Sequence, residues 1–120
     1  YYLLAVSHSP KLIAEEFAKS LNFDKVYGIL YEIDGDGKFT GEIMEKDLIL
    51  DKAKILDRAV SKENLTLETS VGVGDTESDI PFLTKVTNPI CFNPNSILYK
   101  HAQDNGWKTV VERKDVIYEL

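Results

Sequence analysis

The sequence predicts an α/β fold, in which a mainly parallel β-sheet carries helices on both of its faces. Short apolar runs alternate along the whole chain with segments of helical periodicity. The first run, Tyr1–Val6, is continuously apolar, as is typical of a strand buried on both faces. The 120 residues, 43% hydrophobic and 28% charged, have the length and composition of one modest globular domain.

A helix is expected to follow this first strand. Ser9 is expected to cap the helix, and Pro10 suits its first position. The helix is expected to run to about Ser20. Its apolar face, which should pack inward, consists of Leu12, Ile13, Phe17 and Leu21.

A hairpin and a second helix come next. Residues 26–33 and 39–44 are the expected strands, and Asp34-Gly35-Asp36-Gly37 is a strong turn signal between them. We interpret residues 26–44 as a hairpin insertion within a single domain, 1–120. The helix is expected over residues 47–62.

The hairpin turn also hints at a calcium-binding EF-hand loop. Residues 34–45 carry Asp at positions one and three and Glu at position twelve. However, Lys38 and Phe39 occupy positions five and six, and the flanking segments read as strands. A plain hairpin turn is therefore the favoured interpretation.

The second half of the chain predicts alternating strands and helices. Strands are expected at 70–73, 90–92 and 107–111, and helices at 78–85 and 96–105, the last of which Gly106 ends. In parallel sheets of this kind, ligands bind at the carboxyl ends of the strands. Two segments there carry unusual polar residues, namely 7–10 and 74–79.

Charge and cysteine content exclude several classes of protein. The net charge of −6 argues against a general nucleic-acid binder, and no apolar run approaches the ~20 residues of a membrane span. The single cysteine, Cys91, excludes an internal disulfide and is expected to be a packing residue. A cytoplasmic location with no membrane partner is therefore expected.

The segment after the first strand is a candidate phosphate site. Ser7 ends the strand and Pro10 begins the helix, so free backbone N–H groups and the positive end of the helix dipole should meet there. Ser7 adds a hydroxyl donor. The alternative is that Ser9 only caps the helix. The His8 side chain is interpreted as an exposed loop residue whose backbone N–H is the expected contributor.

The segment 74–79 is a candidate metal site. Asp75 and Asp79 lie four residues apart around an expected strand-to-helix turn, and carboxylates at a strand end are natural ligands for Mg²⁺. The alternative is helix capping by Asp75 or Ser78.

Lys52 is the candidate functional cation. On a helical wheel it falls in the middle of the apolar face, whereas Lys54 falls on the polar face. A lysine on a buried face either extends its ammonium to water or meets an anion. We favour the second interpretation.

These motifs together resemble the haloacid dehalogenase-like (HAD) superfamily, in the branch similar to phosphoserine phosphatase. The second motif would be Leu3-Leu4-Ala5-Val6-Ser7, the third Lys52, and the fourth Gly74-Asp75-Thr76-Glu77-Ser78-Asp79-Ile80. Phe92-Asn93-Pro94 is also typical of that branch. The resemblance implies a three-layer, Rossmann-like core.

The resemblance also assigns roles. Ser7 and the neighbouring backbone N–H of His8 would hold a phosphoryl oxygen, and Lys52 would offset negative charge. Asp75 would help to hold Mg²⁺, with Asp79 supporting the same site. The implied activity is hydrolysis of a phosphorylated small molecule through an aspartyl-phosphate.

One departure from the family pattern is decisive. The family's nucleophile belongs to an Asp-x-Asp motif at the end of a first strand, and the six residues before Ser7 contain no such motif. Asp34 and Asp36 lie in the hairpin turn and do not replace it. The family's cap and central first strand are also missing. We therefore expect the C-terminal portion of a longer phosphatase, inactive alone.

The missing strand also implies a partner. Its slot is expected to be filled by the missing N-terminal segment, by a strand swapped from a second copy, or by collapse of the two edges. The alternative functions are a non-catalytic module that binds phosphate and Mg²⁺, and an interaction module that exchanges strands.

Overall fold

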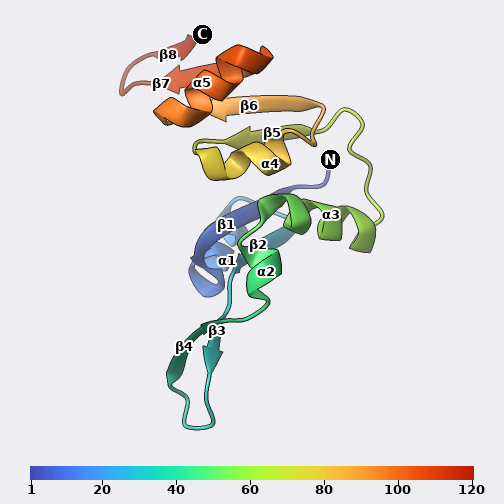
Figure 1. Cartoon of the computed structure of the whole chain (residues 1–120), viewed down its shortest axis with the longest axis vertical. Coiled ribbons are helices and arrows are strands. Elements are labelled where there is room, and N and C mark those ends of the chain that lie inside the picture. The colour runs from blue at the N-terminus through green and yellow to red at the C-terminus, as the bar shows by residue number, and fades with distance from the viewer. The chain divides into compact units, whose positions relative to one another are not determined.

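The computed structural model describes all 120 residues and divides into two units, Tyr1–Arg58 (unit 1) and Ala59–Leu120 (unit 2) (Figure 1). Unit 1 contains two two-stranded sheets and unit 2 one four-stranded sheet, and each unit has its own buried cluster. No helix has the length and apolar character that crossing a bilayer demands.

The sheet of unit 1 consists of the parallel strands β1 (Leu4–Pro10) and β2 (Lys25–Ile29). Helix α1 (Lys11–Ser20) connects them. Two hydrogen bonds between Leu3 and Asp24 align the start of β2 with the start of β1. The Leu3 N–H donates to the Asp24 carboxylate at 2.7 Å, and the Leu3 C=O accepts from the Asp24 N–H at 2.9 Å. The buried side chains of this unit include Ile29, Ile49 and Ile55.

Helix α1 differs from the prediction at its start and on its apolar face. Strand β1 continues to Pro10, which takes the N-cap position, so the expected Ser9 cap is wrong. Only Ala18 of α1 is buried, whereas Phe17 is 73% exposed. The helix therefore lies on the sheet through its small residues rather than its large ones.

Gly28 explains how closely α1 approaches β2. A Cβ atom at this position would lie 2.7 Å from the Cα of Lys11, inside van der Waals contact. Any larger residue would push the helix away from the strand.

The hairpin prediction is confirmed. Strands β3 (Tyr31–Ile33) and β4 (Phe39–Ile43) pair antiparallel. The Asp34 carboxylate accepts the N–H groups of Asp36 and Lys38 at 2.9 and 3.0 Å, which closes the turn. The predicted strand 26–33 is interrupted at Leu30, so β2 belongs to the sheet and β3 to the hairpin.

The predicted helix 47–62 is wrong as a single element. It consists of α2 (Lys46–Ile49) and α3 (Lys52–Lys62). The carboxylate of Asp51 accepts the N–H groups of Ala53 and Lys54 at 3.0 and 3.3 Å, as a capping residue does, and so begins a new helix. Helical periodicity continued across this break and concealed it.

Unit 2 contains a mixed sheet in the order β5, β6, β7, β8. Its strands are β5 (Val71–Gly74), β6 (Asn88–Phe92), β7 (Lys108–Glu112) and the antiparallel β8 (Ile117–Glu119). The sequence predicted the first three and missed β8. This strand is only three residues long and exposed throughout, so it carries no pattern of alternating burial.

Two helices and one 3₁₀ turn accompany this sheet: η1 (Glu77–Asp79), α4 (Ile80–Leu83) and α5 (Ser96–Asn105). Gly106 ends α5 with φ +67°, as predicted. The core contains Leu83, Cys91, Leu98 and Ala102, all fully buried. Cys91 is thus a packing residue, as expected.

The α/β class is confirmed, and the strands form three small sheets: one parallel pair, one antiparallel pair and one mixed sheet of four strands. β1 is an edge strand whose partner is β2, and β5 is an edge strand whose partner is β6. The periodicity of a segment determines its type, but pairing depends on contacts that the sequence pattern does not encode. The three-layer core and its missing central strand remain predictions.

Candidate functional site

The carboxyl end of β5 carries the acidic loop, residues 74–79. Within it, Asp79 is 3% exposed, and its Oδ2 accepts the N–H of Asp75 at 2.9 Å and of Thr76 at 3.2 Å. These bonds direct the buried carboxylate toward the backbone of its own loop. Charge-assisted bonds of this type hold a loop more firmly than neutral ones.

Gly74 makes room for this arrangement. A Cβ atom there would lie 2.6 Å from Asp79 Cβ and 2.7 Å from Asp79 Oδ2. The glycine is therefore needed so that the carboxylate can approach the strand end.

Asp75, like Glu77 and Ser78 in the same loop, is exposed to solvent. Its side chain is exposed, while its backbone is held on both sides. Asp79 Oδ2 accepts its N–H, and its C=O accepts the N–H of Asn95 at 2.9 Å. A carboxylate that is exposed on a fixed backbone suits a hard cation, which prefers oxygen ligands.

The acidic loop also shapes the ionisation of nearby groups. The hydrogen bond from the Asn95 side chain lowers the pKa of Glu77, so this exposed carboxylate stays charged to a lower pH. Burial raises the pKa of Cys91, and the negative charge of Asp79 raises it further. Cys91 therefore remains a neutral thiol.

The candidate metal ligands play unequal parts. Asp75 presents an exposed carboxylate, whereas Asp79 uses Oδ2 to bind the backbone of the loop. No cluster of three or more His, Cys, Asp or Glu side chains that could hold a metal ion is present. This donor set fits Mg²⁺, which often uses one or two carboxylates and takes its remaining ligands from water or phosphate.

Ser7 lies in an irregular part of β1 in unit 1. The parallel ladder pairs Val6 with Tyr27 and then Pro10 with Ile29, so residues 7–9 form a bulge. The Ser7 hydroxyl oxygen accepts the Ser9 N–H at 3.0 Å, which leaves its own O–H to donate. His8 is exposed, as expected. Bulges often reorient side chains beside functional sites.

Lys52 is the first residue of α3 and is half-buried, whereas Lys54 is exposed. This difference agrees with the helical wheel. Ile55, one turn along α3, is fully buried.

The predicted site residues divide between the units. Ser7, His8 and Lys52 belong to unit 1, and Asp75 and Asp79 to unit 2. Within unit 2, hydrogen bonding joins Asp79 directly to Asp75. Sequence reasoning missed Asn95, although an Asn just before a helix is a recognisable capping signal.

Three comparisons relate the chain to known proteins. The sequence model of the haloacid dehalogenase-like hydrolase family matches residues 2–84. The phosphoserine phosphatase SerB1 of Mycobacterium tuberculosis (strain ATCC 25618 / H37Rv) is 27% identical over 104 residues, which is 86% of this chain and 33% of that protein.

Solved structures agree with the sequence match. A phosphoserine phosphatase in apo form has a TM-score of 0.75 and 27% identity, over 96% of this chain and 55% of that one. A substrate-bound phosphoserine phosphatase has a TM-score of 0.69 and 28% identity, and the match covers 83% of this chain and 48% of that one. The chain spans 33–49% of the length of the curated relatives that it matches.

Proposed function

Because the chain belongs to the haloacid dehalogenase-like hydrolase family, we propose that it is part of a Mg²⁺-dependent phosphatase. The reaction is hydrolysis of a phosphomonoester through an aspartyl-phosphate on a nucleophile outside these 120 residues. The resemblance to phosphoserine phosphatases supports this reaction class. The segment alone is proposed to be inactive, because its one Asp-x-Asp sequence, Asp34–Asp36, lies in the hairpin turn.

The observation that carries the proposal is the geometry of the acidic loop. Asp75 lies exposed at a strand end, with its backbone held by the buried Asp79 carboxylate that Gly74 accommodates. In the proposed enzyme Asp75 contributes a ligand to Mg²⁺, and Asp79 holds Asp75 in place. When bound, the cation neutralises charge on the phosphoryl group.

Unit 1 supplies the proposed phosphate ligands. The Ser7 O–H and the His8 backbone N–H donate to phosphoryl oxygens, and the Lys52 ammonium offsets their negative charge. The half-buried position of Lys52 supports this role, because an ammonium interacts more strongly with an anion where water is partly excluded. The proposed substrates are phosphorylated small molecules.

A phosphatase assay with Mg²⁺ tests the proposal. The full-length protein is expected to hydrolyse phosphomonoesters, and chelation by EDTA should abolish turnover. The 120-residue segment should be inactive under the same conditions. Robust turnover by the segment would contradict the assignment of an external nucleophile, and a full-length protein indifferent to Mg²⁺ would contradict the metal assignment.

A strand-exchanging interaction module is the second candidate. The edge strand β5 leaves Val71 and Val73 each 57% exposed, and β1 is also an edge strand. Unpaired strand edges are templates for a further strand. If the isolated segment forms a stable dimer in light scattering, independently of phosphate and Mg²⁺, this second function is favoured.

A further inference from the structure

Asn95 connects the acidic loop to the helix after β6. Its backbone N–H donates to Asp75 C=O at 2.9 Å, its Nδ2 donates to Glu77 Oε2, and its Oδ1 accepts the Leu98 N–H at 3.0 Å. We infer that Asn95 is a positioning residue that holds Asp75 in place for the cation. This inference rests on the proposed function.

The topology explains why one residue can make all three contacts. Strands β5 and β6 are parallel neighbours in which Gly74 pairs with Cys91. The loops that follow them therefore leave the same edge of the sheet. Asn95, four residues after Cys91, meets the acidic loop from the neighbouring strand.

The contacts of Asn95 complement those of Asp79. The Asp79 carboxylate holds the N–H groups of Asp75 and Thr76, whereas Asn95 holds the C=O of Asp75 and the side chain of Glu77. The backbone on both sides of the exposed Asp75 carboxylate is thus fixed before a cation binds. Such preorganisation increases affinity because little ordering remains to be done on binding.

A simple helix cap is the competing explanation, since Oδ1 of Asn95 does cap α5. The two roles use different atoms of the side chain. Ser at this position retains an acceptor for the cap but is too short to reach Glu77. Asn95→Ser therefore removes the side-chain bond to Glu77, while the cap, the net charge and the backbone bond to the Asp75 carbonyl are retained.

A charge-neutral exchange restores the bridge. In the double variant Asn95→Asp with Glu77→Gln, one carboxylate oxygen at position 95 caps α5, and the other accepts from the new side-chain amide at position 77. The summed charge of the pair equals that of the wild-type pair. Because the net charge of the pair is unchanged, rescue by this exchange would come from the restored hydrogen bond between positions 95 and 77.

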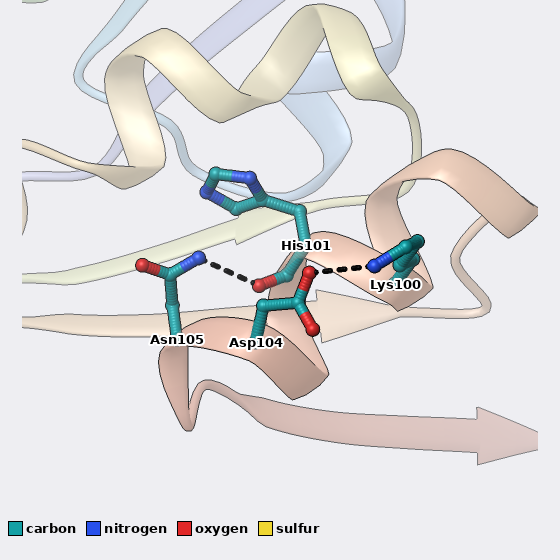
Figure 2. A network of polar contacts seen from close by, with 4 residues as sticks. All are labelled: Lys100, His101, Asp104 and Asn105. Carbon is teal, nitrogen blue, oxygen red and sulfur yellow. Dashed lines mark hydrogen bonds and ion pairs between the residues drawn. The ribbon is translucent and has the colours of Figure 1, made fainter.

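Asn105→Ala is the matched control at the other end of α5. Its Nδ2 donates to the His101 carbonyl at 2.8 Å, beside the Lys100–Asp104 ion pair of 2.9 Å (Figure 2). The variant removes one side-chain hydrogen bond from the same helix without touching the acidic loop. It therefore reports the effect of a weakened α5 alone.

Two measurements on the full-length protein test the inference. In Mg²⁺ titration calorimetry, Asn95→Ser is expected to weaken affinity about tenfold, the double variant to recover it, and Asn105→Ala to leave it unchanged. In amide hydrogen exchange without metal, Asn95→Ser should raise the exchange rates of Asp75 and Thr76 about fivefold, because loss of the Glu77 bond loosens the loop in which the Asp79 carboxylate holds these two N–H groups.

The outcomes separate this inference from the proposed function. The positioning role is overturned if the Asn95→Ser variant has the wild-type amide exchange rates and the wild-type Mg²⁺ affinity. It is also overturned if the double variant restores neither the exchange rates nor the affinity. If exchange rises in Asn95→Ser and is rescued while the wild type binds no Mg²⁺, Asn95 still orders the loop and the metal assignment is overturned. If Asn105→Ala lowers the Mg²⁺ affinity as much as Asn95→Ser does, the effect comes from a weakened α5, and the positioning role is likewise overturned.

Discussion

The two segments that carry the candidate residues are built differently. In unit 2, a buried carboxylate and Asn95 hold the acidic loop through several hydrogen bonds. In unit 1, Ser7 lies in a bulge of β1, where its hydroxyl accepts the N–H of Ser9. The acidic loop is thus held by side-chain hydrogen bonds, whereas the Ser7 segment is held mainly by the pairing of β1 with β2 on either side of it.

The surroundings of the two segments differ in the same way. Unit 2 closes a core in which Leu83, Cys91, Leu98 and Ala102 are fully buried. Unit 1 leaves the large apolar residues of α1 exposed, Phe17 among them. The comparison teaches that the acidic loop is held by several side-chain hydrogen bonds, whereas the Ser7 segment has one, which Ser9 donates to Ser7.

The largest expected effect concerns the exposed carboxylate of the acidic loop. Asp75→Asn should lower the phosphatase activity of the full-length protein about 1,000-fold, since a neutral amide is a poor Mg²⁺ ligand. Urea unfolding should be nearly unchanged, because the side chain is exposed. If activity survives, Asp75 does not hold the cation.

The next effect compares the loss of a large apolar side chain in each unit, measured as the change in the free energy of unfolding. Leu83→Ala should cost about 3 kcal/mol in the free energy of unfolding, because Leu83 is fully buried. Phe17→Ala should cost less than about 0.5 kcal/mol, since Phe17 is exposed. Urea denaturation measures both. A large cost at Phe17 would mean that α1 is covered in the full-length protein.

The two lysines of α3 offer a third test within unit 1. Lys52→Ala should lower kcat/KM about 100-fold, because the half-buried ammonium of Lys52 is the proposed phosphate ligand. The exposed Lys54 is the matched control, and Lys54→Ala should change kcat/KM less than about twofold. Equal losses in the two variants would reject the choice of Lys52.

The smallest expected effect concerns the glycine beneath the acidic loop. Gly74→Ala should destabilise the protein by about 2 kcal/mol, because the added methyl group displaces the Asp79 carboxylate and its two N–H bonds. Gly35 has no neighbour within 4 Å of its Cβ position, so Gly35→Ala should change stability by less than about 0.5 kcal/mol. Urea denaturation with both variants compares them directly, and a neutral Gly74→Ala would show that the loop tolerates a displaced carboxylate.

The sequence predicted the type of nearly every element because periodicity and turn chemistry are local. The hairpin followed from the Asp34–Gly37 turn, and the end of α5 followed from Gly106. The break between α2 and α3 escaped prediction, since Asp51 can either cap a helix or lie within one. The resemblance to haloacid dehalogenase-like hydrolases, read from short motifs, is confirmed by the family match.

What the sequence by itself determined, therefore, is the class of the elements, the family and the residue types available for chemistry. Tertiary structure decided that α1 packs through Ala18 rather than Phe17, and that Asp79 faces the backbone of its loop while Asp75 faces solvent. It also revealed Asn95 as the link to the acidic loop. The packing of α1 and the Asn95 link depend on contacts between separate segments, whose energies no local pattern records, whereas the Asp79 bonds lie within one loop.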